Sequence, residues 1–444
     1  MSDERFELSR RNALIGLGTV GAASAGAGLG TSAYFSDEEE FTGNMMTAGE
    51  LDLAVDYVVH EEQGSAGSYT VNSFTDEVNG TAAGEDLTLD GDGTAMSQTL
   101  ADVKPGDHGH SYFCVTIDDN PAYVWACGEL TGTSENGYTE PEPEDDNGEG
   151  ELEEEILVDV TYCELNDAGE RTSTGETILS GSLREVLGTL QAGVPLDGTG
   201  DGDAAAGGQA PFAGTGGDDG ANPCLCFDWE LPTTVRNGIQ GDSLEFDLSF
   251  HAIQSRHNDG AQNPCADETY AADYVNPDGI GQPIPDGVAR VDVSYGDEAV
   301  AYRITFDEPD GSQYSLADPN FASANFSMPF DLDGDGTYDY QVAWNAQGND
   351  AFRYSGVESG PNWEKDTGTG WSAVPSSIAA SKSGTQAVIV VPRSDLATGG
   401  NGYVFGLSAS AGGEQPYVGI PVGGPYSGAD NFTSSENGQN ATLQ

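Results

Sequence analysis

Three stretches of the chain alternate apolar and polar residues with the period of two that is typical of a half-buried β-strand. Their apolar members are Leu51, Leu53, Val55 and Tyr57, then Ile156, Val158, Val160 and Tyr162, then Leu244, Phe246, Leu248 and Phe250. Clusters of Gly, Asp and Pro separate these and similar runs. Short alternating strands between such turn clusters favour a β-sandwich, which we predict for residues 34–268.

One helix is expected to interrupt the strands. Ser182 and Glu185 have the spacing of a capping box, in which each side chain satisfies a backbone N–H of the first helical turn. The helix would end before Gly193 and bury one apolar face, made of Leu183, Val186, Leu187 and Leu190.

A second set of strand patterns follows at residues 291–295, 299–306, 338–344, 386–391 and 403–407. They predict a second, smaller β-sandwich over residues 289–426. The Pro- and Gly-rich residues 276–287 mark a linker, taken as 269–288, and residues 427–444 form a polar tail. Two low-complexity stretches, 140–155 and 198–220, are predicted to be solvated loops.

The N-terminus has the features of an export signal. Arg5, Arg10 and Arg11 precede a small and apolar run over residues 12–30, and cleavage is expected near Ala33 and Tyr34. Residues 1–33 would then be a signal peptide, with a retained membrane anchor as the alternative. The incomplete twin-arginine pattern leaves both the Sec and the Tat export routes open. No other run is long and apolar enough to give the mature chain a membrane span.

Charge adds the expected environment. The 444 residues contain 75 Asp and Glu against 14 Lys and Arg, which gives a formal net charge of -61. At molar salt the Debye length falls to about 3 Å, so the self-repulsion of such a surface is screened there. This composition, together with patterned apolar strands, predicts a folded halophilic protein that needs salt. The acidic surface also argues against nucleic acid and anionic membranes as partners.

Four segments carry a family resemblance: "GTSAYFSDEEEFTGNMMTAGELDL" (30–53), "DVKPGDHG" (102–109), "DNPAYVWACGEL" (119–130) and "FDWELPTTVRNGIQGDSLEFDLSFHAIQSRHN" (227–258). Over about residues 12–265 the chain resembles salt-loving archaeal members of the TasA/camelysin family, which have SipW-type signal peptides. The resemblance implies a jelly-roll β-sandwich with inserted helices. It also implies extracellular fibres or matrix, in which the N-terminal segment of one subunit completes a sheet of the next. Here that segment would begin near Tyr34 and include residues 41–57.

Six cysteines all fall in the first predicted domain: Cys114, Cys127, Cys163, Cys224, Cys226 and Cys265. An even number in an exported chain predicts disulfides, and six cysteines allow 15 pairings. A metal site is the alternative, because Cys224 and Cys226 would share one face of a strand and could join His108 and His110. The spacing is shorter than in structural zinc sites, which argues against zinc.

A calcium loop is the most specific chemical motif. Oxygen ligands alternate at Asp331, Asp333, Asp335, Thr337 and Asp339, and Gly336 permits the sharp turn. Residue 342, at position twelve, is valine, so the bidentate glutamate of an EF-hand is missing. The motif predicts bound Ca²⁺, and an acidic turn without a metal is the alternative.

Catalytic motifs are absent from the sequence. Camelysins have been classed as metallopeptidases, but His60, His108, His110, His251 and His257 do not form His-Glu-x-x-His, and there is no Gly-x-Ser-x-Gly elbow. We therefore expect no enzyme activity. Trp344, Trp363 and Trp371 could stack on a sugar ring, with core packing as the alternative.

The sequence thus favours an exported cell-surface or extracellular-matrix structural protein that self-associates into fibres or matrix. The alternatives are a monomeric module that binds envelope glycans and, third, a secreted metallopeptidase. Four triplets are glycosylation acceptors, at Asn79, Asn325, Asn431 and Asn440.

Overall fold

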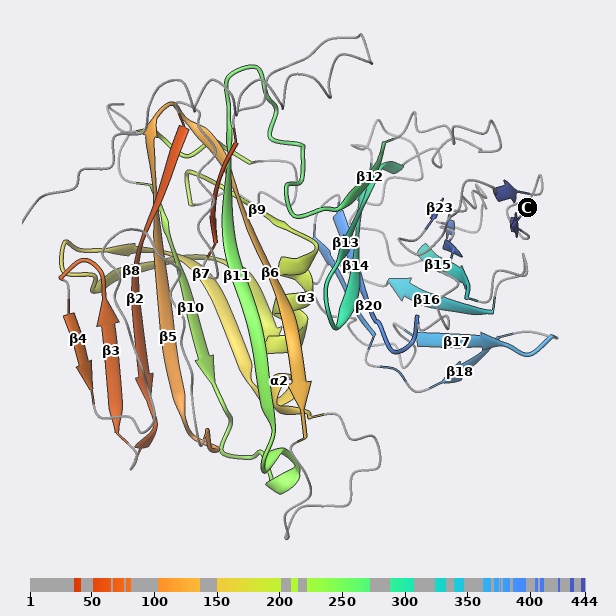
Figure 1. The fold of residues 1–444 in the computed structure, drawn as a ribbon, viewed down its shortest axis with the longest axis horizontal. Helices are drawn as coiled ribbons and strands as arrows, with labels where there is room; N and C mark the ends of the chain where they lie inside the picture. The colour runs from red at the N-terminus through yellow and green to blue at the C-terminus, as the bar shows by residue number, and fades with distance from the viewer. Residues whose placement is uncertain are drawn as a thin grey trace, which may run out of the picture. The chain divides into compact units, whose positions relative to one another are not determined.

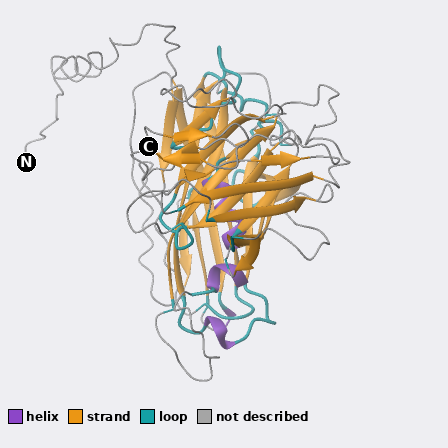
Figure 2. Cartoon of the chain, turned by 90° about the vertical axis from the view of Figure 1, so that its right-hand side faces the viewer, coloured by secondary structure: helices purple, strands orange, loops and turns teal. Residues whose placement is uncertain are grey.

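The computed structural model describes 36–40, 51–64, 67–75, 77–80, 103–135, 150–200, 209–214, 222–271, 288–306, 324–332, 339–346, 362–368, 371–374, 376, 378–383, 386–396, 404–405, 408–410, 422–423, 432–434 and 441–443. Strands dominate these residues and pair in antiparallel sheets (Figure 2). The predicted mainly β class, of sandwich type, is confirmed.

Two sheets enclose the first core (Figure 1). One has seven strands in the order β4-β3-β2-β5-β10-β7-β8, and the other has four in the order β1-β11-β6-β9. The strands in chain order are β1 (Ser36–Glu40), β2 (Leu51–Glu62), β3 (Ser68–Asn72), β4 (Glu77–Gly80), β5 (His108–Asp119), β6 (Ala122–Ser134), β7 (Leu157–Leu165), β8 (Arg171–Ser182), β9 (Val194–Leu196), β10 (Cys224–Glu230) and β11 (Ser243–Gln254). A 3-10 turn, Asn237–Ile239, precedes β11.

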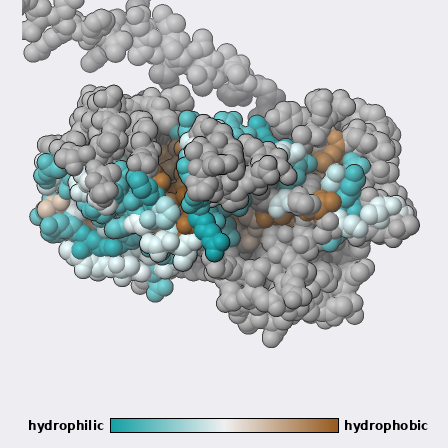
Figure 3. All heavy atoms as spheres, turned by 90° about the horizontal axis from the view of Figure 1, so that it is seen from below, coloured by the Kyte–Doolittle hydropathy of each residue, from teal (hydrophilic) through white to brown (hydrophobic). Residues whose placement is uncertain are grey.

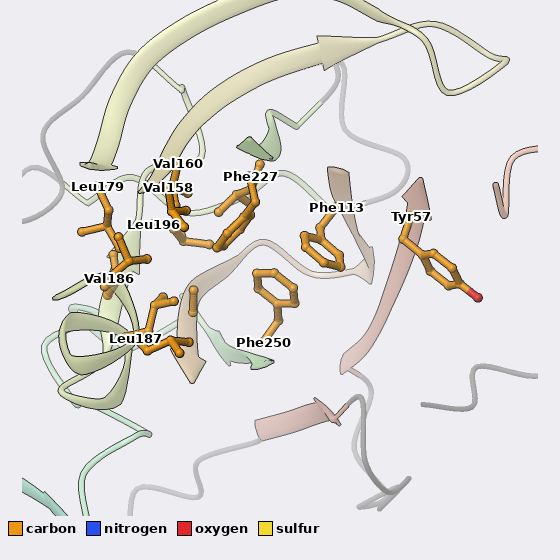
Figure 4. Packing of buried hydrophobic residues seen from close by; sticks show 14 of the residues in the cluster. Tyr57, Phe113, Val158, Val160, Leu179, Val186, Leu187, Leu196, Phe227 and Phe250 are labelled. Carbon is orange, nitrogen blue, oxygen red and sulfur yellow. The ribbon is translucent and has the colours of Figure 1, made fainter. Parts of the chain in front are cut away.

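Aromatic rings from both sheets meet in this core. Phe113 of β5 lies 5.6 Å from Phe227 of β10, edge to face, and 5.5 Å from Phe250 of β11, measured between ring centroids. Figure 4 shows these rings beside the aliphatic side chains of the helix that closes the core. The alternation predicted for β2 is confirmed, because Leu53 and Tyr57 are buried whereas Ala54 and Asp56 are exposed.

The inserted helix forms as predicted. Helix α3 (Leu183–Gln191) begins at Ser182, whose hydroxyl accepts from the Glu185 N–H at 3.3 Å, while the Glu185 carboxylate accepts from the Ser182 N–H at 2.9 Å. Its four predicted apolar residues are buried. The helix stops where Gly193 takes φ +83, a left-handed conformation that glycine adopts without steric cost.

The later strands form two further sheets, β12-β13-β14-β20-β19 and β18-β17-β16-β15-β21-β23, with β22 also paired to β15. Tyr302 of β14 and Phe330 of β15, both fully buried, meet across these sheets with ring centroids 6.1 Å apart. The bounds are β12 (Glu268–Ala271), β13 (Val288–Tyr295), β14 (Ala299–Phe306), β15 (Ala324–Asp331), β16 (Tyr340–Ala346), β17 (Asn362–Asp366), β18 (Trp371–Val374), β19 (Ala379–Ser383), β20 (Gln386–Pro392), β21 (Val404–Phe405), β22 (Ser408–Ser410) and β23 (Val422–Gly423).

One residue departs from the predicted alternation. Phe246, expected on the buried face of β11, is 43% exposed. The register between β11 and β6 shifts between Glu245 and Phe246. A bulge of this kind bends and twists the paired strands. Near it, residues therefore no longer alternate regularly between the buried and the exposed face of the sheet.

Both predicted loop regions contain folded parts, so their assignment as solvated throughout is wrong. In the first, helix α2 (Leu152–Glu155) buries Leu152 and Glu153, and the Glu153 carboxylate pairs with Arg184 of α3 at 2.5 Å. In the second, Phe212 is fully buried, and its backbone exchanges hydrogen bonds with Ala122. One ion pair fixes the first segment, and one buried aromatic ring fixes the second. The Gly, Asp and Glu residues around them gave no indication of either in the sequence.

Other predicted segments lie partly or wholly outside the described residues. These are the signal peptide with Ala33 and Tyr34, and residues 276–287 of the linker. Within the predicted tail, β24 (Phe432–Ser434) pairs with β25 (Ala441–Leu443). None of the helices in the described ranges is long and apolar enough to span a lipid bilayer.

Candidate functional site

All six cysteines are joined in three disulfides: Cys114–Cys224, Cys127–Cys265 and Cys163–Cys226. Cys224 and Cys226 lie on one face of β10, as predicted, but each has a sulfur partner rather than a shared metal. The first and third disulfides pack with Val58 and Tyr112 in a small cluster separate from the main core. Disulfides persist in oxidising compartments, where each is expected to stabilise the fold by about 2–4 kcal/mol.

A row of polar side chains crosses the seven-stranded sheet on the face that carries these disulfides. His60 of β2 is directly opposite Thr70 of β3 on one side and His110 of β5 on the other. His110 is in turn opposite Asp228 of β10, which faces Asp159 of β7. Because side chains opposite each other in antiparallel strands share a face, these residues form one line, which we call the histidine row.

Specific contacts orient the middle of the histidine row. The His60 Nδ1 lies 2.7 Å from the Thr70 Oγ1, and the rings of His60 and His110 have centroids 5.1 Å apart. His110 stacks on Tyr112 with centroids 4.3 Å apart and an interplanar angle of 11°.

A neighbouring cation completes the row. Arg171 of β8 places its guanidinium carbon 5.2 Å from the centre of the Tyr112 ring, and its Nη1 donates to Asp228 at 2.5 Å. The arginine therefore neutralises the one carboxylate that faces His110.

Burial controls the charge of this row. Desolvation, followed by the repulsion of His60, lowers the pKa of His110 to about 4, although Asp228 acts in the opposite direction. Burial likewise raises the pKa of the Tyr112 hydroxyl. At neutral pH the His110 imidazole is uncharged, so one of its nitrogens has a free lone pair.

The sequence pointed to a different histidine pair. His108 and His110 share strand β5 and one face, but His108 is exposed and its Nδ1 lies 3.3 Å from the Gly106 carbonyl oxygen. The partner of His110 is His60, fifty positions earlier, and only strand register reveals it. His251 is half-buried, and its Nε2 lies 3.2 Å from the Ser249 hydroxyl. His257 is exposed.

The predicted calcium loop is described only at its two ends. Asp331 ends β15, and Asp339 donates its N–H to the Phe330 carbonyl at 2.8 Å. The Asp339 carboxylate accepts from the Leu332 N–H at 2.9 Å. The other expected ligands, Asp333, Asp335 and Thr337, lie outside the described residues. The ends thus form a closed turn, and calcium binding stays a prediction.

Three carboxylates that no motif in the sequence indicates come together in the fold. Oxygens of Glu135, Glu151 and Asp242 all lie within 4.8 Å of one another, and the three residues are half-buried. The Glu151 N–H also donates to Asp242 at 2.7 Å. Oxygen ligands of this kind suit a hard cation. No local spacing could have indicated the group, because Asp242 joins from a distant part of the chain.

The remaining candidate residues are scattered over the strands. Trp344, Trp363 and Trp371 belong to the neighbouring strands β16, β17 and β18, and their side chains are not among those described. Asn79 is exposed on β4, where its amide donates to Glu77. Asn325 lies in β15, between β16 and β22. Asn431 and Asn440 lie outside the described residues.

The N-terminal strand occupies the edge of the four-stranded sheet. Strand β1 pairs with β11 over five residues, from Ser36 opposite Ile253 to Glu40 opposite Ser249. The next strand, β2, belongs to the seven-stranded sheet. Among the strands that the structure describes, β11 is therefore the one neighbour of β1 in its sheet.

Comparison with known proteins identifies no family. No family model matches the chain, and no curated protein sequence matches it. Among solved structures, a β-glucuronidase from an uncultured Clostridium sp. is 8% identical with a TM-score of 0.18, over 88% of this chain and 47% of that chain. A β-D-glucuronidase from Dictyoglomus thermophilum is 8% identical with a TM-score of 0.17, over 85% of this chain and 44% of that chain. The chain thus spans less than half of either enzyme, and likeness at these TM-scores carries no argument.

Proposed function

We propose that this protein is an exported structural component of the cell surface or extracellular matrix, and that its copies join by exchanging strand β1. The observation that carries the proposal is the position of β1 at a sheet edge, where, among the described strands, it pairs its backbone with β11. The same backbone hydrogen bonds can be made by β1 of another copy, because strand addition depends on the edge and not on chain identity.

The covalent framework is compatible with this exchange. The earliest cysteine, Cys114, lies in β5, so all three disulfides connect segments that follow β1 and β2. Strand β1 can therefore leave its place without breaking a covalent cross-link. Two of the disulfides meanwhile tie strands of the seven-stranded sheet to one another, and the third ties β6, the neighbour of β11, to Cys265.

Charge sets the conditions under which copies could meet. A net charge of -61 makes two copies repel each other at low ionic strength. At molar salt the repulsion acts over only about 3 Å, so close approach of two sheet edges becomes feasible. Figure 3 shows a mostly hydrophilic surface among the described residues on the face in view, so backbone pairing is a better source of affinity than surface hydrophobicity.

Electron microscopy of chains that begin at residue 34, in molar NaCl, tests the proposal. Filaments are expected from the intact chain and should be lost when residues 34–44 are deleted, because the exchanged strand is then missing. Deletion of the last eleven residues, 434–444, is the control of equal length and should leave filaments intact.

Filaments that persist without residues 34–44 would contradict strand exchange. A chain that stays monomeric in molar salt and binds envelope glycans would favour the glycan-binding module instead. Hydrolysis of casein that a chelator abolishes would favour the metallopeptidase.

A further inference from the structure

We propose that His60 and His110 form a binding site for a divalent transition-metal ion. The site lies on the histidine row of the seven-stranded sheet, and the inference is independent of the strand exchange proposed above. It rests on three features of the row: the register of two histidines, the contacts that fix their rings, and the nature of the ligand atoms.

The register brings the two imidazoles to one place. His60 and His110 are directly opposite on β2 and β5, with ring centroids 5.1 Å apart and planes tilted by 30°. Side chains at opposite positions have Cβ atoms about 4.5–5.5 Å apart. A transition-metal ion sits about 2.0–2.1 Å from each imidazole nitrogen. A small rotation of the rings about their side-chain bonds therefore lets one nitrogen from each reach the same ion.

Neighbouring side chains hold both rings in defined orientations. Thr70 Oγ1 lies 2.7 Å from Nδ1 of His60, which leaves the Nε2 of that ring available. Metal-binding histidines usually use their second nitrogen in such a contact, which fixes the tautomer and the ring orientation. His110 is fixed by its parallel stack on Tyr112. These contacts limit each ring to a small range of orientations, and the rotation needed to share one ion is made within that range.

The ligand type selects the class of ion. Imidazole nitrogen suits Zn²⁺, Ni²⁺ and Cu²⁺, whereas the carboxylates that cover this protein suit Ca²⁺ and Mg²⁺. The sequence argued against zinc because the spacing of Cys224 and Cys226 is shorter than in structural zinc sites. Both cysteines are in disulfides, and the site proposed here uses no cysteine.

Isothermal titration of the intact chain with Ni²⁺, at neutral pH with an excess of Mg²⁺ to occupy carboxylates, tests the site. We expect one Ni²⁺ per chain, with binding lost in His60→Gln and in His110→Phe, which keeps a ring on Tyr112. Thr70→Val should weaken binding about tenfold, the lower end of the usual range for a contact that orients a metal ligand.

His108→Gln is the matched control, because this histidine is two residues from His110 on the same strand and is exposed. Its Ni²⁺ affinity should be unchanged. Circular dichroism at high salt establishes that each variant is folded. Equal Ni²⁺ binding in the folded His60→Gln and His110→Phe variants, no binding to the intact chain, or loss of binding in His108→Gln would each overturn the assignment.

Discussion

Replacing Arg303 by methionine is expected to lower the free energy of unfolding by about 1–3 kcal/mol, the usual cost of taking a donor away from buried hydrogen-bond acceptors. Arg303 of β14 is only 3% exposed. Its Nε donates to the Ala192 carbonyl at the end of α3 at 3.0 Å, and its Nη1 donates to Gln386. Methionine fills similar space but removes both hydrogen bonds, so the Ala192 carbonyl retains its bond from the Asn263 side-chain N–H at 2.7 Å while the Gln386 oxygen loses its Arg303 donor. It also removes a positive charge near Asp292. Burial lowers the pKa of the Arg303 guanidinium to about 10, and the attraction of Asp292 acts in the opposite direction.

Denaturant unfolding in molar salt measures this change. Arg256→Met is the matched control, because Arg256 is exposed. The control should stay within about 0.5 kcal/mol of the parent, as surface substitutions usually do. A loss in Arg303→Met no larger than that of the Arg256→Met control would contradict the account, because the buried acceptors of Arg303 would then not need this donor.

Phe212→Ala should cost about 3–5 kcal/mol, the range for truncating a fully buried aromatic side chain. Phe212 is 0% exposed and packs into the main core from a segment that otherwise consists of small and acidic residues. Phe246→Ala provides a control with the same chemical change, since Phe246 is 43% exposed. Thermal or denaturant unfolding of both variants should give a much larger loss for Phe212. Equal losses would show that Phe212 does not anchor the segment.

Local patterns were sufficient for the regular elements. The period-two alternation of β2 and the strand patterns in the second half of the chain correspond to strands in the structure. Helix α3 was predictable in type and extent because its cap, its apolar face and the glycine after it all act within a few residues of one another. These features depend on neighbours in sequence, which is the information that a single sequence contains.

Features that depend on register were not predictable in the same way. Six cysteines allow 15 pairings, and only the alignment of β10 between β5 and β7 brings Cys224 beside Cys114 and Cys226 near Cys163. The pairing of His60 with His110 has the same origin. A shift of one residue in either strand would place the two rings on opposite faces of the sheet.

Single buried residues within polar segments were also not predictable from the sequence. Glu153 was grouped with an acidic loop, yet it is fully buried against Arg184. Composition averages over a window, whereas burial is decided residue by residue, so one ion pair or one aromatic ring can fix a segment that looks featureless. The burial of a single charged or aromatic residue in a polar segment can therefore be recognised only from the fold.

Disulfide trapping of β1 against β11 tests strand exchange most directly. Glu38 and His251 are opposite each other in this pair. Opposite residues of antiparallel strands have Cα atoms about 4.5–5.5 Å apart, which a disulfide can bridge. One chain carries Glu38→Cys and the other carries His251→Cys, and the two are mixed in molar salt under mild oxidation.

Strand exchange predicts a covalent dimer, seen on a non-reducing gel, that forms in the mixture and in neither variant alone. A mixture that yields no covalent dimer, while a single chain with both substitutions closes its disulfide internally and completely, would contradict the central claim that β1 joins one copy to the next.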